Sequence, residues 1–186
     1  YMFAAGSSNL DVQFYHFSSR QTQQLANTSV DDRLAVVNPQ QDKVAYVGLA
    51  TGTEEIWMTD SDGQNQRQLS HFRDQRHFLD LAWSPDGKQL VATLSISGNA
   101  QLYVVGADGG EPRRLTQTES IDTEPVFSAD GKTIFFVSDR GGSPQIYRMG
   151  AQGGAAQRVT FTGNYNISPA PSPDGRWLAF ISRVNG

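Results

Sequence analysis

The sequence contains no cysteine and no long hydrophobic run, and only 18% of its 186 residues are charged. Without cysteine, the chain cannot use a disulfide scaffold, a thiol nucleophile or a cysteine-ligated zinc site. No stretch approaches the roughly 18 apolar residues that a membrane-spanning helix needs. Fifteen basic and nineteen acidic residues give a net charge of −4, and no basic run is present. We therefore expect no nucleic-acid partner and no direct membrane insertion.

A turn motif recurs at a fixed distance along the chain. Residues 82–88 read AWSPDGK, residues 126–132 read VFSADGK and residues 170–176 read APSPDGR, so that equivalent aspartates are about 44 residues apart. A degenerate copy, VVNP, stands at residues 36–39. Two further landmarks keep the same spacing. They are an apolar–aromatic pair (Phe14-Tyr15, Ile56-Trp57, Leu102-Tyr103, Ile146-Tyr147) and a closing pair (Leu25-Ala26, Leu69-Ser70, Leu115-Thr116, Val159-Thr160). A period of roughly 40–50 residues is typical of solenoids and propellers.

The content of one unit favours a propeller. Proline, aspartate and glycine in the turn motif predict a tight turn between antiparallel strands. Each turn is followed by a short apolar run without alternation, as at residues 134–137, which is typical of a strand buried on both faces. A glycine-rich loop, a third strand and a fourth strand complete the unit, and no helical periodicity is visible. The sequence therefore predicts an all-β fold, a β-propeller of four-stranded antiparallel blades.

We expect one domain over residues 1–186, divided into units at approximately 1–27, 28–70, 71–116, 117–160 and 161–186. Counting a first strand at residues 1–5, the units contain 17 strands, one more than four complete blades. This count fits a fragment, a ring with few blades, or a homo-oligomer in which several chains share one ring. A closing seam is expected where the C-terminal unit pairs with residues 12–17 and 22–25, because such a seam removes exposed strand edges.

Catalytic chemistry has little support in the sequence. There is no Gly-x-Ser-x-Gly elbow, and His16, His71 and His77 lie in different repeats without the spacing of metal ligands. The Asp-Gly turns lie at the tips of separate blades and cannot converge on one calcium ion. We expect no enzyme activity, no catalytic residue, no metal site and no cofactor.

The candidate binding residues stand at the start of each first strand, because that strand lines the central tunnel of a propeller. We call this region the tunnel mouth. Counting back six and four residues from the turn serine or asparagine gives two rings, with an acidic bias. The candidate partner-binding residues of the two rings are Asp32, Phe78, Asp80, Asp122, Glu124, Asn166 and Ser168. Loops on a rigid scaffold are where binding groups concentrate, so a protein or peptide is the expected partner, although the same residues also fit a merely solvated face.

From about residue 76 the chain resembles the TolB-like β-propeller family. The resemblance rests on His77, on WSPDG at 83–87, on TEP at 123–125, on SDRGGSPQIY at 138–147 and on GGAAQRVT at 153–160. It implies a non-enzymatic scaffold for protein interaction in the periplasm, as part of the Tol–Pal system. It further implies that a Pal-like lipoprotein docks at the tunnel mouth, and that His77, Thr123 and Glu124 stand among the partner-contacting residues.

Residues 1 to about 75 keep the period but differ from the TolB-like motifs, since Asn-Pro-Gln-Gln-Asp-Lys at 38–43 replaces the Ser-Pro-Asp-Gly-Lys turn. This half, with TGTEEIW at 51–57, is more similar to the periplasmic sensory propellers of CadC-like membrane-bound regulators. Two further alternatives stay open. One is an accessory propeller of a hydrolase, and the other is a hybrid chain joined near residue 75 that has no natural function.

Overall fold

A computed structural model describes residues 9–25, 30–72 and 74–183, and within them the chain forms strands, turns and loops without a helix. Sixteen strands are present in this part. Their bounds are β1 Gln13–His16, β2 Gln21–Gln24, β3 Asp32–Val37, β4 Lys43–Gly48, β5 Glu55–Asp60, β6 Arg67–Gln68, β7 His77–Trp83, β8 Gln89–Ile96, β9 Asn99–Gly106, β10 Arg113–Arg114, β11 Asp122–Phe127, β12 Thr133–Ser138, β13 Gln145–Gly150, β14 Gly153–Arg158, β15 Asn166–Pro171 and β16 Leu178–Ser182.

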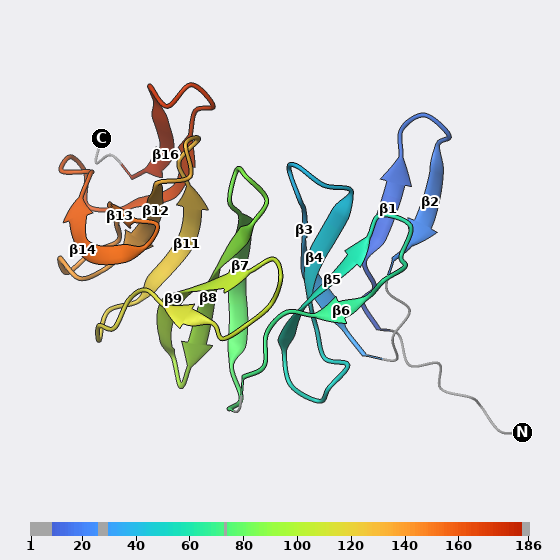
Figure 1. Cartoon of the computed structure of the whole chain (residues 1–186). Helices are drawn as coiled ribbons and strands as arrows, with labels where there is room; N and C mark the ends of the chain where they lie inside the picture. Colours follow the sequence, from blue (N-terminus) through green and yellow to red (C-terminus); the bar gives the residue numbers. More distant parts are fainter. Residues whose placement is uncertain (1–8, 26–29, 73, 184–186) are drawn as a thin grey trace, which may run out of the picture.

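The strands form five antiparallel sheets in chain order. Three sheets have four strands each, namely β3–β6, β7–β10 and β11–β14, and each is a simple meander. The two outer sheets have two strands each, β1–β2 and β15–β16. Figure 1 shows these sheets standing side by side like blades. The prediction of a β-propeller with four-stranded antiparallel blades is confirmed, and the seventeenth strand expected at residues 1–5 lies outside the described residues.

The row of sheets is open. The β1–β2 pair and the β15–β16 pair lie at opposite ends of it, with the three complete sheets between them (Figure 1). The closing seam expected within the chain, between the C-terminal unit and residues 12–17 and 22–25, is therefore absent from the described residues. The reason is geometric: each sheet packs on the sheets next to it in sequence, and the chain would have to bend into a full circle to bring its two outer sheets together.

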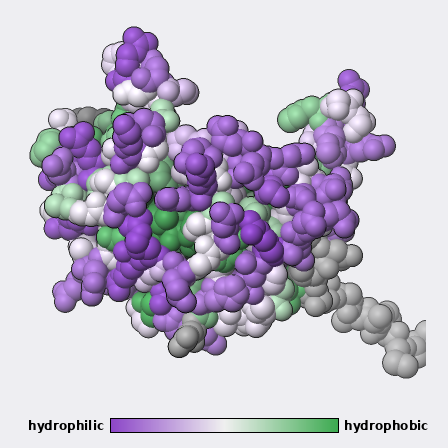
Figure 2. All heavy atoms as spheres, viewed as in Figure 1, coloured by the Kyte–Doolittle hydropathy of each residue, from purple (hydrophilic) through white to green (hydrophobic). Residues whose placement is uncertain are grey.

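The apolar core lies between neighbouring sheets. One cluster joins β4 and β5 to β7, β8 and β9, around Leu90 and Ile56. A second joins β8 and β9 to β12 and β13, around Phe136 and Leu102. The second strands of the three complete sheets are buried on both faces, as Val44–Val47 of β4 shows, which confirms the interpretation of the short apolar runs there. The run at residues 178–181 is a correction: it is largely exposed, because among the described residues β16 has a neighbouring strand on one side only. Hydrophilic residues cover most of the face seen in Figure 2, and hydrophobic residues are visible between them near the middle of this face.

The recurring turn motif folds in the same way in three units. In the first, the Ser84 hydroxyl donates a 2.6 Å hydrogen bond to the Asp86 carboxylate, which also accepts the backbone N–H of Lys88 at 3.1 Å. Gly87 follows with φ of +66°, a conformation that glycine adopts without strain. The serine hydroxyl, followed by the backbone N–H, lowers the pKa of Asp86, and the same contacts lower the pKa of Asp130 and Asp174. These aspartates therefore hold turns together.

Candidate functional site: the tunnel mouth

The tunnel mouth is built by the first strand of each unit. β7 lies against both β3 and β11, and β11 lies against β15, so these four strands follow one another along the row (Figure 1). They begin at Asp32, His77, Asp122 and Asn166. The candidate residues therefore lie at or near the starts of these four strands.

The first ring consists of the residues six positions before the turn serine or asparagine, and its side chains point into the blades. Asp32, Phe78, Asp122 and Asn166 are all buried, with exposed fractions of 0–4%. Phe78 belongs to the apolar core. The Asn166 amide donates hydrogen bonds to the Gln145 side chain at 2.7 Å and to the Thr162 carbonyl at 2.9 Å. These side chains are occupied by internal contacts and do not face a partner.

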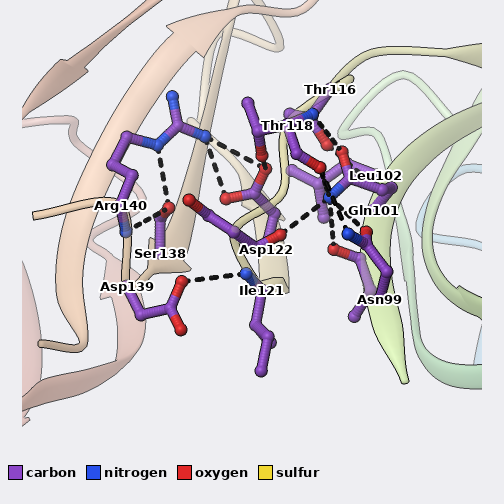
Figure 3. Close-up of polar contacts among 12 residues, drawn as sticks. Asn99, Gln101, Leu102, Thr116, Thr118, Ile121, Asp122, Ser138, Asp139 and Arg140 are labelled. Carbon is purple, nitrogen blue, oxygen red and sulfur yellow. Dashed lines mark hydrogen bonds and ion pairs between the residues drawn. The ribbon is translucent and has the colours of Figure 1, made fainter. Parts of the chain in front are cut away.

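Asp122 is the clearest example. Its two carboxylate oxygens accept hydrogen bonds from one terminal nitrogen of Arg140 at 2.9 and 3.0 Å, and the Thr118 hydroxyl donates to it at 3.2 Å (Figure 3). The Asp122 side chain is fully buried and that of Arg140 is 23% exposed. The Arg140 guanidinium also lies 5.0 Å from the Tyr147 ring centroid. The pair fastens the start of β11 to the loop after β12.

The ring counted four residues before the turn links neighbouring blades. The Asp80 carboxylate accepts the backbone N–H of Glu124 at 3.0 Å, and the Glu124 carboxylate accepts the backbone N–H of Ser168 at 2.6 Å. Glu124 and Ser168 have φ of +52° and +56°, which turns their N–H groups toward the preceding blade. Asp80 and Glu124 are half-buried, and Ser168 is exposed. Thr123 is half-buried and pairs with Val137 in the sheet.

A third group of contacts surrounds Glu54, which the sequence analysis missed. Its carboxylate accepts hydrogen bonds from the Arg33 side chain at 2.5 Å and from the Phe78 backbone N–H at 2.8 Å. It also lies 2.9 Å from Nδ1 of His77. Burial by itself would raise the pKa of Glu54, but these donors together hold that pKa below its ordinary value. The only feature of the sequence that marks Glu54 is its position directly before the third strand of its unit, because Gly98 and Pro144 stand directly before the third strands of the next two units. Glu54 joins β3, β7 and the loop before β5.

His77 stands at the rim of an open groove. Its side chain is 77% exposed, whereas that of Glu54 behind it is 9% exposed. The groove has a volume of about 500 Å³. Its walls include Leu49, Thr53, Glu54, Arg76, His77 and Ser95. The arrangement offers an imidazole and polar side chains on a rigid support, which suits recognition of a polar surface.

The described residues hold no group of three or more histidine, aspartate or glutamate side chains that could bind a metal ion. In the same part of the chain there is no helix that is long and apolar enough to cross a membrane.

Comparison with known proteins agrees with this architecture. The TolB protein of the Tol–Pal system from Thioalkalivibrio sulfidiphilus is 38% identical over 44% of this chain and 19% of its own length. The one from Bordetella pertussis is 42% identical over 46% of this chain and 30% of its own length. The chain thus spans less than a third of these relatives.

Solved structures give the same answer. The crystal structure of TolB from Acinetobacter baumannii is 31% identical, with a TM-score of 0.76, over 94% of this chain and 43% of the TolB chain. An oligogalacturonate lyase is similar in fold alone, at 19% identity, with a TM-score of 0.73 over 92% of this chain and 50% of the lyase. The profile of the TolB β-propeller domain matches residues 35–186. The match includes part of the segment, residues 1 to about 75, whose sequence is more similar to CadC-like propellers. The chain belongs to the TolB β-propeller domain family.

Proposed function

We propose that this chain is a non-enzymatic scaffold that binds a protein at the tunnel mouth, through the groove beside His77. The observation that carries the proposal is the pairing of an exposed imidazole with a buried, anchored carboxylate. The His77 side chain is 77% exposed, and Glu54 holds its Nδ1 at 2.9 Å. A side chain that is both exposed and fixed loses little conformational entropy when a partner binds.

The partner that we propose is a Pal-like lipoprotein, and the proposed location is the periplasm. Two relatives are named as TolB proteins of the Tol–Pal system, which supports this choice. Of the nine candidate residues, the proposal keeps His77, Asp80, Thr123, Glu124 and Ser168, which are exposed or half-buried. Among these, Asp80 and Glu124 also connect blades, so substituting them would change both binding and stability. Substituting His77 tests binding alone.

The experiment is a titration of this chain against the soluble domain of a Pal lipoprotein. We expect His77→Ala to weaken binding about tenfold, equivalent to about 1.4 kcal/mol. The melting temperature should stay within about 1 °C, because an exposed surface contact contributes little to stability. The matched control is His16→Ala on β1, whose imidazole bonds Gln23 at 3.3 Å in another sheet. This control should bind as the unchanged chain does.

Two results would contradict the proposal. If the unchanged chain does not bind the Pal domain, the choice of partner is wrong. If His77→Ala binds as tightly as His16→Ala, the position of the site is wrong.

A further inference from the structure

A polar cavity lies at the end of the sheets away from the tunnel mouth. β7 begins at the mouth with His77 and ends with Trp83, so the turn that follows it lies at the far end. There the turns of the three complete sheets enclose a cavity of about 650 Å³, which we call the turn-side cavity. All of its lining residues belong to these complete sheets and their turns, and they include Gln40, Ser84, Asp86, Phe127, Asp130 and Gly131.

Between the first two complete sheets, the chain uses its own side chains to bind the next turn. The Asn38 side chain is buried, and its amide donates a 2.9 Å hydrogen bond to the Gly87 carbonyl of the next unit. The Gln40 amide donates to the Pro85 carbonyl at 2.9 Å. Two planar N–H donors from one unit thus satisfy two carbonyls of the unit that follows.

The turn-side cavity lacks the first of these donors. Ser84 stands at the position of Asn38, and its hydroxyl donates within its own turn. Gly131, which corresponds to Gly87, has a carbonyl that accepts no hydrogen bond from the residues that the structure describes. The packing is also looser here. A Cβ added at Gly87 would lie 2.3 Å from the Asn38 oxygen, whereas the nearest atom to one at Gly131 would be 3.6 Å away.

The second donor is replaced by a carboxylate. Asp86 stands at the position of Gln40, and an ionised carboxylate only accepts hydrogen bonds. Oδ1 of Asp86 accepts the Ser84 hydroxyl and the Lys88 N–H, and Oδ1 of Asp130 has the same two contacts in its own turn. The serine hydroxyl and the N–H keep the pKa of both aspartates below its ordinary value. Within the described part of the chain, Oδ2 of neither aspartate has a hydrogen bond or an ion pair.

The last copy of the turn shows which group this second oxygen binds. There Oδ2 of Asp174 accepts a 2.6 Å hydrogen bond from Nε of Arg176. Lys88 and Lys132 stand at the position of Arg176, and neither ammonium group forms an ion pair among the described residues. A guanidinium presents planar, fixed N–H donors, whereas an ammonium is a point charge on a flexible stem. The same motif therefore pairs with a guanidinium where the chain supplies one.

We propose that the turn-side cavity binds the guanidinium group of an arginine residue that another protein chain presents. Its N–H groups donate to the Gly131 carbonyl and to Oδ2 of Asp86 and Asp130. The ring of Phe127 lies in the lining, and guanidinium planes stack favourably on aromatic rings. A volume of about 650 Å³ is within the range of ligand sites and exceeds the size of a guanidinium ion, so the rest of the residue fits as well.

The experiment is an NMR titration of the whole chain with N-acetyl-arginine amide. We expect a Kd of about 1 mM, as for a well-placed ligand of this size. The backbone amides of Lys88 and Lys132 donate to the two aspartates at 3.1 and 3.0 Å, so their signals should shift. N-acetyl-citrulline amide has the same length without the charge, and it should bind about tenfold more weakly. Unshifted signals at both lysines, or equal affinity for the two probes, would overturn the proposal.

Two variants locate the site. Asp130→Asn keeps an acceptor for the turn but removes a charge, and it should weaken binding about threefold. The matched control is Asp174→Asn, the same change in an equivalent turn outside the cavity, which should bind as the unchanged chain does. Ser84→Asn introduces the side chain that the first unit has at this position. It should abolish binding while the turn still forms, because Oδ1 of Asn38 accepts the backbone N–H of Gln40 at 2.9 Å in the first unit.

Three further outcomes would contradict the proposal. Equal binding by Asp130→Asn and Asp174→Asn would show that the arginine probe binds elsewhere, and undiminished binding by a folded Ser84→Asn would show the same. If methylguanidinium binds as tightly as N-acetyl-arginine amide, the ligand is a small guanidinium compound and not a residue of a partner chain. The titration contains no Pal domain and does not involve His77, so its result is independent of the function proposed for the tunnel mouth.

Discussion

The carboxylate of Asp80 accepts a 3.0 Å hydrogen bond from the backbone N–H of Glu124, one repeat further along the chain. Glu124 does the same for Ser168 at 2.6 Å. The two acids at the tunnel mouth therefore form a series of contacts that tie each first strand to the next. Their negative charge has a structural role in addition to any role in binding.

The first prediction follows from this series. Asp80→Ala removes the acceptor of the Glu124 N–H, and the free energy of unfolding should fall by about 1 kcal/mol, since the site is only half-buried. For a chain of this size the melting temperature should fall by about 2–4 °C. Thermal denaturation measures it. The control is Asp108→Ala, whose side chain is fully exposed and lies 3.9 Å from Arg67, and no change in melting temperature is expected. Equal effects of the two substitutions would refute the structural role of Asp80.

The second prediction concerns the buried pair of Asp122 and Arg140. Arg140→Ala leaves the Asp122 carboxylate, which is fully buried, without its cation and should cost about 3–5 kcal/mol. The C-terminal unit has the uncharged Asn166 at the equivalent position. Adding Asp122→Asn should therefore recover part of the loss, and a double-mutant cycle by urea unfolding measures the recovery. A double variant that is no more stable than Arg140→Ala would show that the buried charge is not the cause.

The turns could be predicted from the sequence because their physics is local. The Ser84 hydroxyl and the Asp86 carboxylate that define a turn are two residues apart, and serine and aspartate at this spacing make the same hydrogen bond in three units. The strand after each turn could also be predicted, from four or five consecutive apolar residues. Its burial is not local: β8 and β12 are buried between two strands, whereas β16 lies beside one strand in the described chain and is largely exposed.

The sequence could not predict which side chains of the tunnel mouth are buried and which are exposed. Each first strand contains an irregularity, such as the register shift between Thr123 and Val126, so that counting back along the strand does not tell which face a residue occupies. Asp122 is buried for this reason, although the sequence suggests a surface acid. The contact of Arg33 with the Phe78 carbonyl joins residues 45 positions apart, and nothing in the local sequence marks it.

The third prediction concerns pH. Burial raises the pKa of Glu55, although the Ser70 hydroxyl and the Phe72 N–H act in the opposite direction. The equivalent residues Gln101 and Gln145 are uncharged and accept hydrogen bonds in the same place. A raised pKa in the folded chain contributes stability that is complete below the unfolded pKa of about 4.3 and is lost as the pH rises through the folded value.

Glu55→Gln should therefore raise the melting temperature at pH 7, where the unchanged chain has a buried carboxylate. Near pH 4 the carboxyl group is protonated, and the two proteins should melt at nearly the same temperature. Thermal denaturation between pH 4 and pH 7 tests this difference. A variant that is less stable than the unchanged chain by the same amount at every pH would disprove the assignment to Glu55 ionisation.

The fourth prediction compares two glycines in equivalent turns. Gly87 and Gly175 have nearly the same backbone, with φ of +66° and +69°. A Cβ added at Gly175 would meet no atom within 4 Å, whereas one at Gly87 would lie 2.3 Å from the Asn38 side-chain oxygen. Asn38 is buried and cannot move freely, because its amide donates to the Gly87 carbonyl at 2.9 Å and its oxygen accepts the Gln40 N–H at 2.9 Å.

Gly175→Ala should therefore cost only the strain of a left-handed residue, about 1–2 kcal/mol. Gly87→Ala should cost the same strain and, in addition, about 1–3 kcal/mol for the displaced hydrogen bonds of Asn38. Urea unfolding of both variants gives the difference. If Asn38 is the cause, Asn38→Ala combined with Gly87→Ala should cost clearly less than the sum of the single changes, because the clash is already removed. Equal costs for the two glycines would mean that Asn38 moves aside for the added methyl group at little cost.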